Sequence, residues 1–366
     1  MKKAIADTIR DFTATKRVAV GFDGYIDRIL RVKQYGAKDH HYIDTMERFG
    51  SYIVAKAGKS CSLELRLVEE KLGGNMPNYA HCLSRLGIEV DCVGAMGWPE
   101  IHPLFAQGLH NCRLYSVCQP GLSDALEFGD GKVLLAKNGE IETLNYDVVT
   151  RRLGPGKAAG LFARADMLTF LNWSELKGAT SIWEGIGNEL FPQISRRDTP
   201  MLVDFSDCSG KSREDILKIA QVLAGYGEKL RLYLSLNLNE AEQLALKLGQ
   251  KPSGPVKLAR LLLERFEPEL LAIHLTDGCI YAGAAGEGFI PNNVIESPKI
   301  LTGGGDNFNA GLSFGVLMGL DMKSALLLGN AVSGYYVSCG HSPDRAQLLS
   351  WLNQYHTMGE KKYENS

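Results

Sequence analysis

The sequence predicts an α/β fold, with a doubly wound and mostly parallel β-sheet, helices on both faces and a small β lid. Short apolar runs typical of strands alternate with stretches typical of helices, which indicates a sheet covered by helices. Apolar residues make up 45% of the 366 residues, enough for a large core. No internal repeat or long linker interrupts this pattern, so residues 1–366 are expected to form a single domain.

The individual elements follow from local patterns. The strand candidates are short apolar segments, namely Arg17–Gly21, Glu89–Gly94, Met167–Asn172, Met201–Phe205, Leu230–Leu236 and Leu270–Thr276. The helix candidates between them are Asn78–Leu86, Ser212–Ala224, Glu240–Leu248 and Val256–Phe266. At the N-terminus, Ile5, Ile9 and Phe12 share one face, which predicts an amphipathic helix and not a signal peptide.

Charge and cysteine content exclude several classes of protein. The formal net charge is −2, which gives no overall attraction to nucleic acid or to an anionic membrane, so neither partner is expected. No apolar run is long enough to span a bilayer. The 8 cysteines are scattered without a Cys-x-x-Cys pair, which argues against a zinc site or a disulfide framework. The expected location is the cytoplasm.

Two segments interrupt the alternation of strands and helices. Asp27–Val32 mixes charged and apolar residues directly after the first strand, and Ala125–Ala136 has an Asp-Gly pair between two β-prone runs, a strong hairpin signal. We expect the segments at about 25–35 and 113–145 to form a small antiparallel lid over one edge of the sheet. From these residues alone, a surface hairpin without a role is the alternative.

The most informative motif is a run of three glycines before Asp306. Gly303, Gly304 and Gly305 lead into a helix rich in small and apolar residues. Glycines let the backbone approach a ligand closely, and the first N–H groups of a helix have no internal partner, so this helix start is suited to phosphoryl oxygens. The helix dipole favours the carboxylate of Asp306, which can accept a proton beside a bound phosphate. An acidic helix start without function is the alternative.

Two earlier motifs are suited to binding hydroxyl groups. Gly74, Asn75 and Asn78 lie at the start of a helix, and the two carboxamides both donate and accept hydrogen bonds. Asp23 and Asp27 follow the first strand, and ligands of open α/β sheets bind beyond the carboxyl ends of strands. The alternatives are a plain N-cap at Asn78 and a turn-forming Asp-Gly pair.

A further polar pair follows the strand Leu230–Leu236. The side-chain oxygens of Asn237 and Glu240 are suited to orienting water around Mg²⁺, which keeps much of its hydration shell. An N-cap with an acidic first turn explains the same residues equally well. Two Gly-Lys-Ser runs, at 58–60 and 210–212, resemble a Walker loop but lack its first glycine, and no Gly-x-Gly-x-x-Gly follows the first strand.

In this order, the motifs resemble those of the ribokinase (PfkB) family of carbohydrate kinases, from about Val18 to Pro343. The resemblance implies transfer of the terminal phosphoryl group of ATP to a sugar or sugar-like hydroxyl, with Mg²⁺, and it makes the Ala125–Ala136 hairpin the family's lid. It implies that Asp306 is the catalytic base and that Gly303–Gly305 form the anion hole. It also implies substrate contacts from Asp23, Gly74, Asn75 and Asn78, a Mg²⁺-water motif at Asn237 and Glu240, and nucleotide contacts from Thr276, Gly278, Asn330 and Gly334.

The sequence departs from the family pattern in places that concern the substrate. Ile300, Leu301 and Thr302 stand where the family usually has Asp-Thr, so its monovalent-cation site is not carried over. The segment Trp98–Pro103 and a long insertion with a helix expected at His41–Lys56 change the surroundings of the expected sugar pocket.

Three other functions fit the same motifs. They are an ADP-dependent sugar kinase of the same superfamily, a nucleoside kinase, and a catalytically silent sugar-binding protein. ATP is favoured over ADP because the continuation Phe308–Gly311 is closer to ribokinase, and a retained base argues against a silent binder. We also expect that the lid can pair two copies of the chain as a homodimer.

Overall fold

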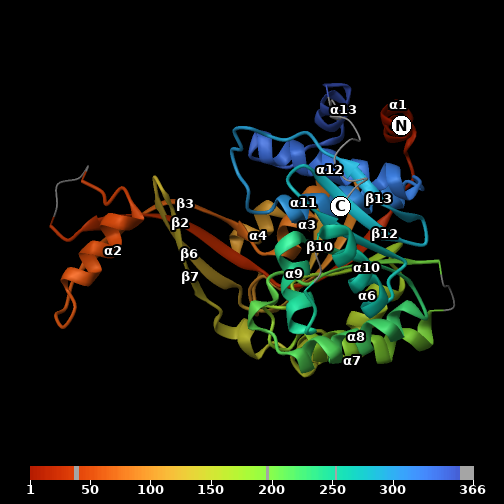
Figure 1. Ribbon diagram of the computed structural model, residues 1–366. Coiled ribbons are helices and arrows are strands. Elements are labelled where there is room, and N and C mark those ends of the chain that lie inside the picture. The colour runs from red at the N-terminus through yellow and green to blue at the C-terminus, as the bar shows by residue number, and fades with distance from the viewer. Residues whose placement is uncertain (37–40, 195–197, 252–253, 355–366) are drawn as a thin grey trace.

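Two β-sheets of unequal size form the framework of the chain (Figure 1). The computed structural model describes residues 1–36, 41–194, 198–251 and 254–354. The larger sheet has nine strands in the order β13-β12-β11-β10-β9-β8-β1-β4-β5. Neighbouring strands from β11 across to β5 are parallel, whereas β12 and β13 are antiparallel at one edge. The predicted doubly wound, mostly parallel sheet is therefore confirmed.

All six predicted strands are present in the larger sheet. Its strands are β1 (Arg17–Phe22), β4 (Glu89–Ala95), β5 (Cys112–Cys118), β8 (Met167–Phe170), β9 (Pro200–Asp204), β10 (Arg231–Asn237), β11 (Leu270–His274), β12 (Gly278–Gly283) and β13 (Gly286–Pro291). Successive side chains of a strand point to opposite faces, and β1 shows the result. Val18 and Val20 enter one buried apolar cluster and Ala19 and Phe22 the other. Both faces of the sheet are therefore covered.

Helices cover each face of the larger sheet. One face carries α1 (Lys2–Asp11), α3 (Asn75–Arg85), α11 (Gly304–Leu317), α12 (Met322–Cys339) and α13 (Arg345–Gln354). The other carries α5 (Tyr146–Leu153), α6 (Lys157–Ala163), α7 (Ala179–Leu190), α8 (Arg213–Gly227), α9 (Leu238–Lys247) and α10 (Pro255–Phe266). The predicted helix at Asn78–Leu86 begins three residues earlier than expected, at Asn75, because Gly74 and not Asn78 is its N-cap.

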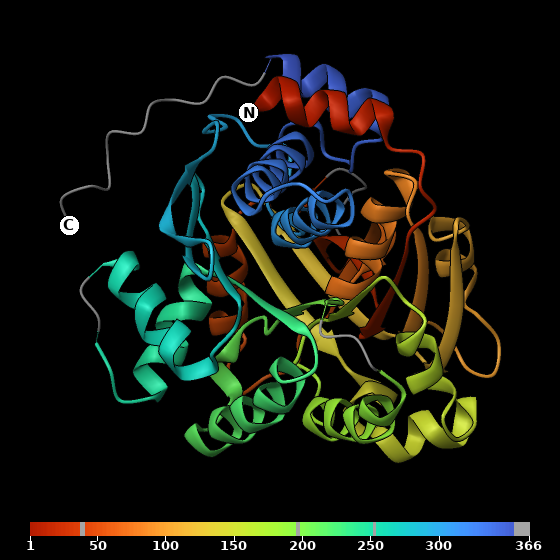
Figure 2. The same cartoon turned by 90° about the vertical axis from the view of Figure 1, so that its right-hand side faces the viewer.

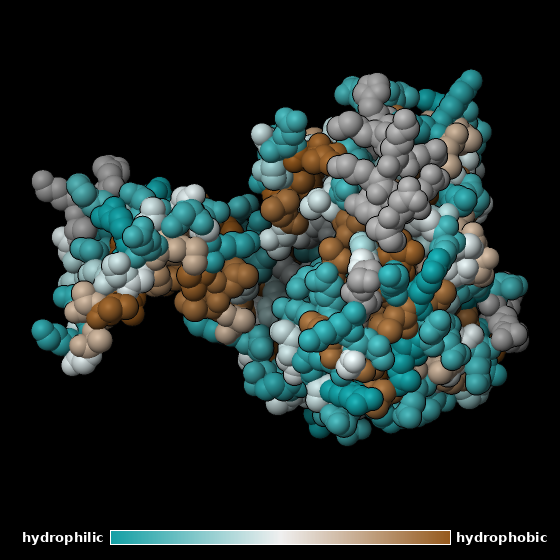
Figure 3. Space-filling model, in the orientation of Figure 1, coloured by the Kyte–Doolittle hydropathy of each residue, from teal (hydrophilic) through white to brown (hydrophobic). Residues whose placement is uncertain are grey.

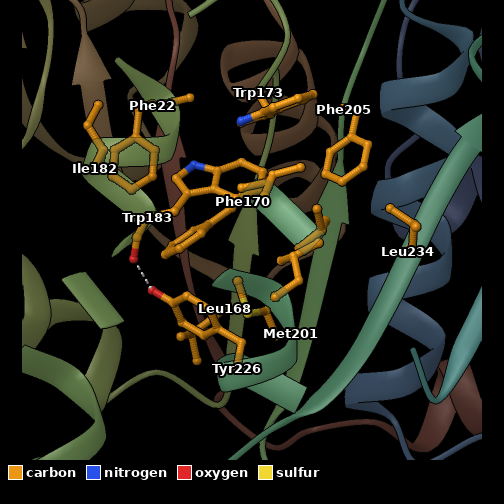
Figure 4. Packing of buried hydrophobic residues seen from close by; sticks show 14 of the residues in the cluster. Phe22, Leu168, Phe170, Trp173, Ile182, Trp183, Met201, Phe205, Tyr226 and Leu234 are labelled. Carbon is orange, nitrogen blue, oxygen red and sulfur yellow. Dashed lines mark hydrogen bonds between the residues drawn. The ribbon is translucent and has the colours of Figure 1, made fainter. Parts of the chain in front are cut away.

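Aromatic side chains fill the core beneath α7 and α8 (Figure 4). Phe170 of β8 packs against Trp183 and Tyr226, with ring centroids 5.3 and 5.6 Å apart. The hydroxyl of Tyr226 donates to the carbonyl of Trp183 at 2.7 Å, so the polar end of this buried ring is satisfied. This packing fixes the carboxyl ends of the central strands, where the predicted site residues lie.

The N-terminal helix α1 lies beside α13 (Figure 2). Ile5 and Ile9 are buried, as the amphipathic pattern predicted, and Phe12 meets Phe314 edge-on at 5.9 Å. Arg345 ties the two helices together by donating to the carbonyl of Phe12 at 2.9 Å. Among the helices of the described residues, none is long and apolar enough to span a membrane.

The segments predicted to form a lid contribute to the smaller sheet, which we call the lid and whose topology differs from the expected one. It consists of β2 (Tyr25–Gln34), β3 (Leu63–Gly73), β6 (Gly121–Phe128) and β7 (Gly131–Lys137) in the order β3-β2-β6-β7. The expectation of an antiparallel lid is wrong at its centre, where β2 and β6 are parallel. Both strands leave the carboxyl edge of the larger sheet, after β1 and after β5, so they run outward side by side. Strand β3 was not predicted.

The expected lid segment 113–145 also begins too early. Cys112–Cys118 forms β5 and pairs in parallel with β4, so it belongs to the larger sheet. Within the expected segment, the lid strands span 121–128 and 131–137, followed by a short 3-10 helix at Gly139–Thr143. The chain leaves the larger sheet between Cys118 and Gly121, where the amide of Gly121 donates to the carbonyl of Gly24 at 3.0 Å.

The lid has a small apolar core of its own and projects from the body (Figures 1 and 3). Helix α2 (Met46–Ala55), which lies inside the predicted helical stretch, packs on this core through Phe49, whose ring lies 5.3 Å from that of Phe128. Large apolar side chains remain exposed on the edge strands β3 and β7. They are Leu65, Leu67, Val68, Leu134 and Leu135.

Candidate active site

Asp306 lies in the first turn of α11, at the carboxyl edge of the larger sheet. Gly303 precedes this helix with φ +88°, a conformation that favours glycine, and a Cβ there would lie 2.9 Å from the hydroxyl of Tyr336. The amide of Gly304 donates to the carbonyl of Leu301 at 3.1 Å. Gly305 and Asp306 occupy the next helical positions, whose N–H groups have no acceptor within a helix. The predicted glycine-rich helix start is therefore formed.

Helix α3 brings its first turn to Asp306 from a distant part of the chain. The side-chain amide of Asn78 donates to Oδ2 of Asp306 at 3.0 Å, although the two residues are 228 positions apart. The side chain of Asn75, in the same turn, also lowers the pKa of this carboxyl group. The structure therefore unites two motifs that the sequence suggested separately.

The carboxyl group of Asp306 is buried among other acids. Burial raises its pKa well above the ordinary value, the negative charges of Asp204 and Asp23 raise it further, and the side chains of Asn78 and Asn75 oppose this shift. Within the described residues, Oδ1 of Asp306 has no hydrogen-bond partner. A buried carboxyl group with a raised pKa and one free oxygen is suited to accepting a proton.

Asp23, at the end of β1, holds the start of α3 in place. Its two carboxylate oxygens accept from the backbone amides of Asn75 and Met76, at 2.7 and 2.8 Å. Gly74, with φ +91°, allows this approach, because a Cβ there would lie 2.7 Å from Oδ2 of Asp23. Burial raises the pKa of Asp23 to about 6. Asp23 is thus an anchor of the site, which the sequence had suggested only as a hydroxyl-binding residue.

Asp27 lies on β2, at the base of the lid. It is half-buried, and burial raises its pKa to about 6, while the charges of Lys71 and Lys132 lower it. Both lysines are carried by lid strands, β3 and β7. Asp27 therefore lies near two lysines of the lid.

Two site residues were missed by the sequence analysis. Asn172, after β8, donates from its side-chain amide to Asp23 at 2.9 Å, and its Oδ1 is buried without a partner among the described residues. Asp204, the last residue of β9, accepts from Asn309 of α11 at 2.7 Å. Both are polar residues at the carboxyl ends of strands, the same signal that identified Asp23.

Asn237 and Glu240 form a reciprocal cap at the start of α9. Glu240 accepts from the backbone and side-chain amides of Asn237, at 2.9 and 2.6 Å, and its own amide donates to Asn237 Oδ1 at 2.9 Å. Burial, followed by repulsion from Asp204, raises the pKa of Glu240 to about 8. Within the described residues, no three His, Cys, Asp or Glu side chains are arranged to hold a metal directly.

The predicted nucleotide residues lie together beside α11. Thr276 and Gly278 flank Asp277, whose carbonyl accepts from the amide of Asn292 at 2.8 Å. A Cβ on Gly334 would lie 3.4 Å from Asn292 Oδ1, so α12 meets the same segment. On α12, Asn330 donates to the carbonyl of Ile290 at 2.9 Å, and Ser333 donates to that of Gly304 at 2.9 Å. This group therefore adjoins the glycine run.

Proteins of similar sequence include sugar kinases. The chain matches the family model described as prokaryotic ketohexokinase over residues 2–355. A ketohexokinase of Haloferax volcanii is 26% identical over 343 residues, covering 93% of this chain and 91% of that protein. A 5-dehydro-2-deoxygluconokinase of Shouchella clausii is 28% identical over 298 residues, covering 78% of this chain and 86% of that protein.

Solved structures share the fold at lower sequence identity. A ribokinase of Thermotoga maritima gives a TM-score of 0.61 at 17% identity and covers 93% of this chain and 100% of its own. Arabidopsis thaliana ribokinase, complexed with ribose and ATP, gives a TM-score of 0.63 at 15% identity and covers 93% and 99%. The predicted resemblance is confirmed, and the chain belongs to the prokaryotic ketohexokinase family, among the sugar kinases with the ribokinase fold.

Proposed function

We propose that this protein phosphorylates a hydroxyl group of a ketohexose with ATP, and that Asp306 is the general base. The observation that carries the proposal is the buried carboxyl group of Asp306 at the start of α11. Asn78 holds one of its oxygens, and the other has no hydrogen-bond partner in the described part of the chain. Its raised pKa makes it a stronger base than an exposed aspartate. The ketohexose comes from the name of the Haloferax relative, and ATP from the complex of the Arabidopsis enzyme.

The transfer proceeds in line, with positioning and charge stabilisation supplied by the protein. Oδ1 of Asp306 takes the proton of the sugar hydroxyl while the oxygen of that hydroxyl bonds to the γ-phosphorus of ATP. The bond from that phosphorus to the bridging oxygen breaks, and ADP leaves with the electron pair. The amides of Gly303 and Gly305 donate to the charge that develops on the transferred group, whereas that of Gly304 is held by Leu301. The sugar is oriented by side chains at the ends of the two motifs, namely Asp23, Asp27, Asn75 and Asn78. Gly74, which has no side chain, lets the sugar approach the backbone closely.

Asn237 and Glu240 fit the role of holding the water shell of Mg²⁺. Their donor atoms are oxygens, which this ion prefers, and each capping hydrogen bond leaves lone pairs available to water. The repulsion between Glu240 and Asp204 is also the kind that a nearby cation relieves. When bound, Mg²⁺ neutralises charge on the donor phosphates. Thr276, Gly278, Asn330 and Gly334 then enclose the nucleotide.

A turnover screen tests the proposed function. Fructose and tagatose, with ribose and adenosine as competitors, are each offered with Mg²⁺ and either ATP or ADP, and the phosphorylated product is identified by mass. We expect ketohexose phosphate with ATP. Turnover of adenosine alone would identify a nucleoside kinase. Turnover of a sugar with ADP but not with ATP would identify an ADP-dependent sugar kinase. Stabilisation by a sugar without any product would identify a silent sugar-binding protein.

We also propose that the exposed apolar edges of the lid pair two copies of the chain. Leu67 of β3 and Leu134 of β7 are 52% and 58% exposed on the two edge strands of the lid, and an exposed apolar edge strand can pair with another chain. Changing both to Asp should convert a dimer to a monomer in light-scattering measurements. Leu246→Asp on α9, where the side chain is 56% exposed away from the lid, is the matched control. An unchanged mass in both variants would contradict the lid as the interface.

A further inference from the structure

A lysine of the lid contacts the loop that leads into the glycine run. Lys132, the second residue of β7, donates from Nζ to the hydroxyl oxygen of Thr302 at 3.0 Å, although the two residues are 170 positions apart. Thr302 directly precedes Gly303, the N-cap of α11. The contact therefore joins the lid to the segment where the transferred phosphoryl group is expected, and it places a positive charge one residue away from that segment.

The body of the protein holds the same threonine from the other side. Tyr336 of α12 donates its hydroxyl to the carbonyl of Thr302 at 3.0 Å. Burial, with the nearby charges of Asp306 and Asp27, raises the pKa of Tyr336 to about 12, so its hydroxyl keeps the proton that it donates. The loop before Gly303 is thus fixed on α12, while the lid reaches it through a long and exposed lysine side chain.

Lys132 also acts on the sugar side of the site. Its charge lowers the pKa of Asp27, the half-buried carboxyl group at the base of the lid. The ammonium group is therefore near enough to Asp27, at the base of the lid, to act on its charge, and it contacts the loop before Gly303 directly. An ammonium group has three N–H donors, and Thr302 takes one of them in this structure.

We propose that Lys132 is a phosphate-binding residue carried by the lid. With both substrates bound, its N–H donors turn from Thr302 to the oxygens of the transferred phosphoryl group, whose charge grows during the transfer. Because the lysine belongs to the lid, this charge is in place only when the lid lies over the sugar, which restrains hydrolysis of ATP without sugar. The proposal rests on the proposed function, because it takes the phosphoryl group to lie at Gly303–Gly305.

Four variants separate a phosphate contact from a structural tie. Lys132→Met removes the charge and keeps the length, and Lys132→Arg restores a cation. Lys137→Met is the matched control, since Lys137 lies on the same strand and pairs with Asp124 at 3.2 Å within the lid. Thr302→Val removes the resting partner of Lys132 and leaves the lysine itself. Circular dichroism and melting temperature establish that each variant is folded.

The lysine is tested by turnover and by binding. Lys132→Met should lower kcat by about 10²-fold, the scale found when one donor to developing charge is lost, and Lys132→Arg should recover most of that. Calorimetry in the presence of sugar uses the β,γ-methylene analogue of ATP, which cannot transfer its terminal phosphoryl group. Lys132→Met should lose about 10-fold in affinity for this analogue and little for AMP, which lacks the terminal phosphate, since a charge-assisted hydrogen bond contributes on that scale. Lys137→Met and Thr302→Val should stay within threefold of the wild type.

Three results would overturn the proposal. They are a kcat of Lys132→Met within twofold of the wild type, an equal loss in Lys137→Met, and a loss in Thr302→Val as large as that in Lys132→Met. The last would show that the contact only ties the lid to the loop. The nucleotide affinities test the role of Lys132 even if no turnover is found. A fully active Asp306→Asn variant would contradict the role of Asp306 as general base, and the Lys132 variants would still test the role of Lys132.

Discussion

The substitution Asp306→Asn tests the proposed base most directly. Asparagine keeps the size of the side chain, and its carbonyl oxygen can still accept from Asn78, the bond that measures 3.0 Å in the wild type. The amide cannot accept the proton of the substrate hydroxyl. General-base catalysis contributes about 10²–10⁴-fold, so kcat should fall by that factor. The KM values should change far less, because the lost interaction belongs to the transition state.

The same substitution should stabilise the free protein at neutral and higher pH. The folded-state pKa of Asp306 lies well above the ordinary value of 3.8, so the folded protein binds this proton more tightly than the unfolded chain. The wild type therefore loses stability as the pH rises from 3.8 toward the folded pKa, by about 1.4 kcal/mol for each unit between the two. Asparagine does not titrate, and its amide can face Asp204 without repulsion.

Two measurements check this prediction. A coupled assay for ADP release gives kcat and KM, and thermal melts from pH 5 to pH 8 give the stability. Asp306→Asn should melt at or above the wild type at pH 8, and the difference should shrink toward pH 5. Asp321→Asn is the control, since Asp321 caps α12 outside the site and should leave kcat unchanged. A folded Asp306→Asn protein with kcat within tenfold of the wild type would refute the reasoning.

Three further substitutions test the surroundings of the base. Glu240→Gln should raise the Mg²⁺ concentration needed for half-maximal rate, whereas Glu242→Gln, exposed on the same helix, should not; an identical titration in both would leave Glu240 as a helix cap alone. Asp204→Asn removes a charge that raises the pKa of Asp306, so the acid limb of kcat/KM should move to lower pH, and an unmoved limb would contradict this coupling. Asp23→Ala should raise the sugar KM and lower the melting temperature, because each hydrogen bond from α3 to Asp23 contributes about 0.5–1.5 kcal/mol to stability. An equal rise in the nucleotide KM would indicate a general structural fault.

Local patterns in the sequence were sufficient for most of the framework. The apolar runs that became β1, β4, β8, β9, β10 and β11 are buried on both faces, and such runs have a strong signal of their own. Strand β3 was missed because its residues are mostly exposed and heavily charged, so it lacks this signal. The rule that ligands bind beyond strand ends identified Asp23, and applied equally to β8 and β9 it would have identified Asn172 and Asp204.

The sequence by itself determined which groups are available, namely the glycine run before Asp306, the asparagines after Gly74 and the polar strand ends, because each depends on neighbours along the chain. Only the tertiary structure decided how they act on one another. Asn78 meets Asp306, Asp204 raises the pKa of both Glu240 and Asp306, and Lys132 reaches Thr302. Hydrogen bonds and charges act through space over a few ångströms, and these residues come that close only because the parallel strands and the lid bring together segments as much as 228 positions apart.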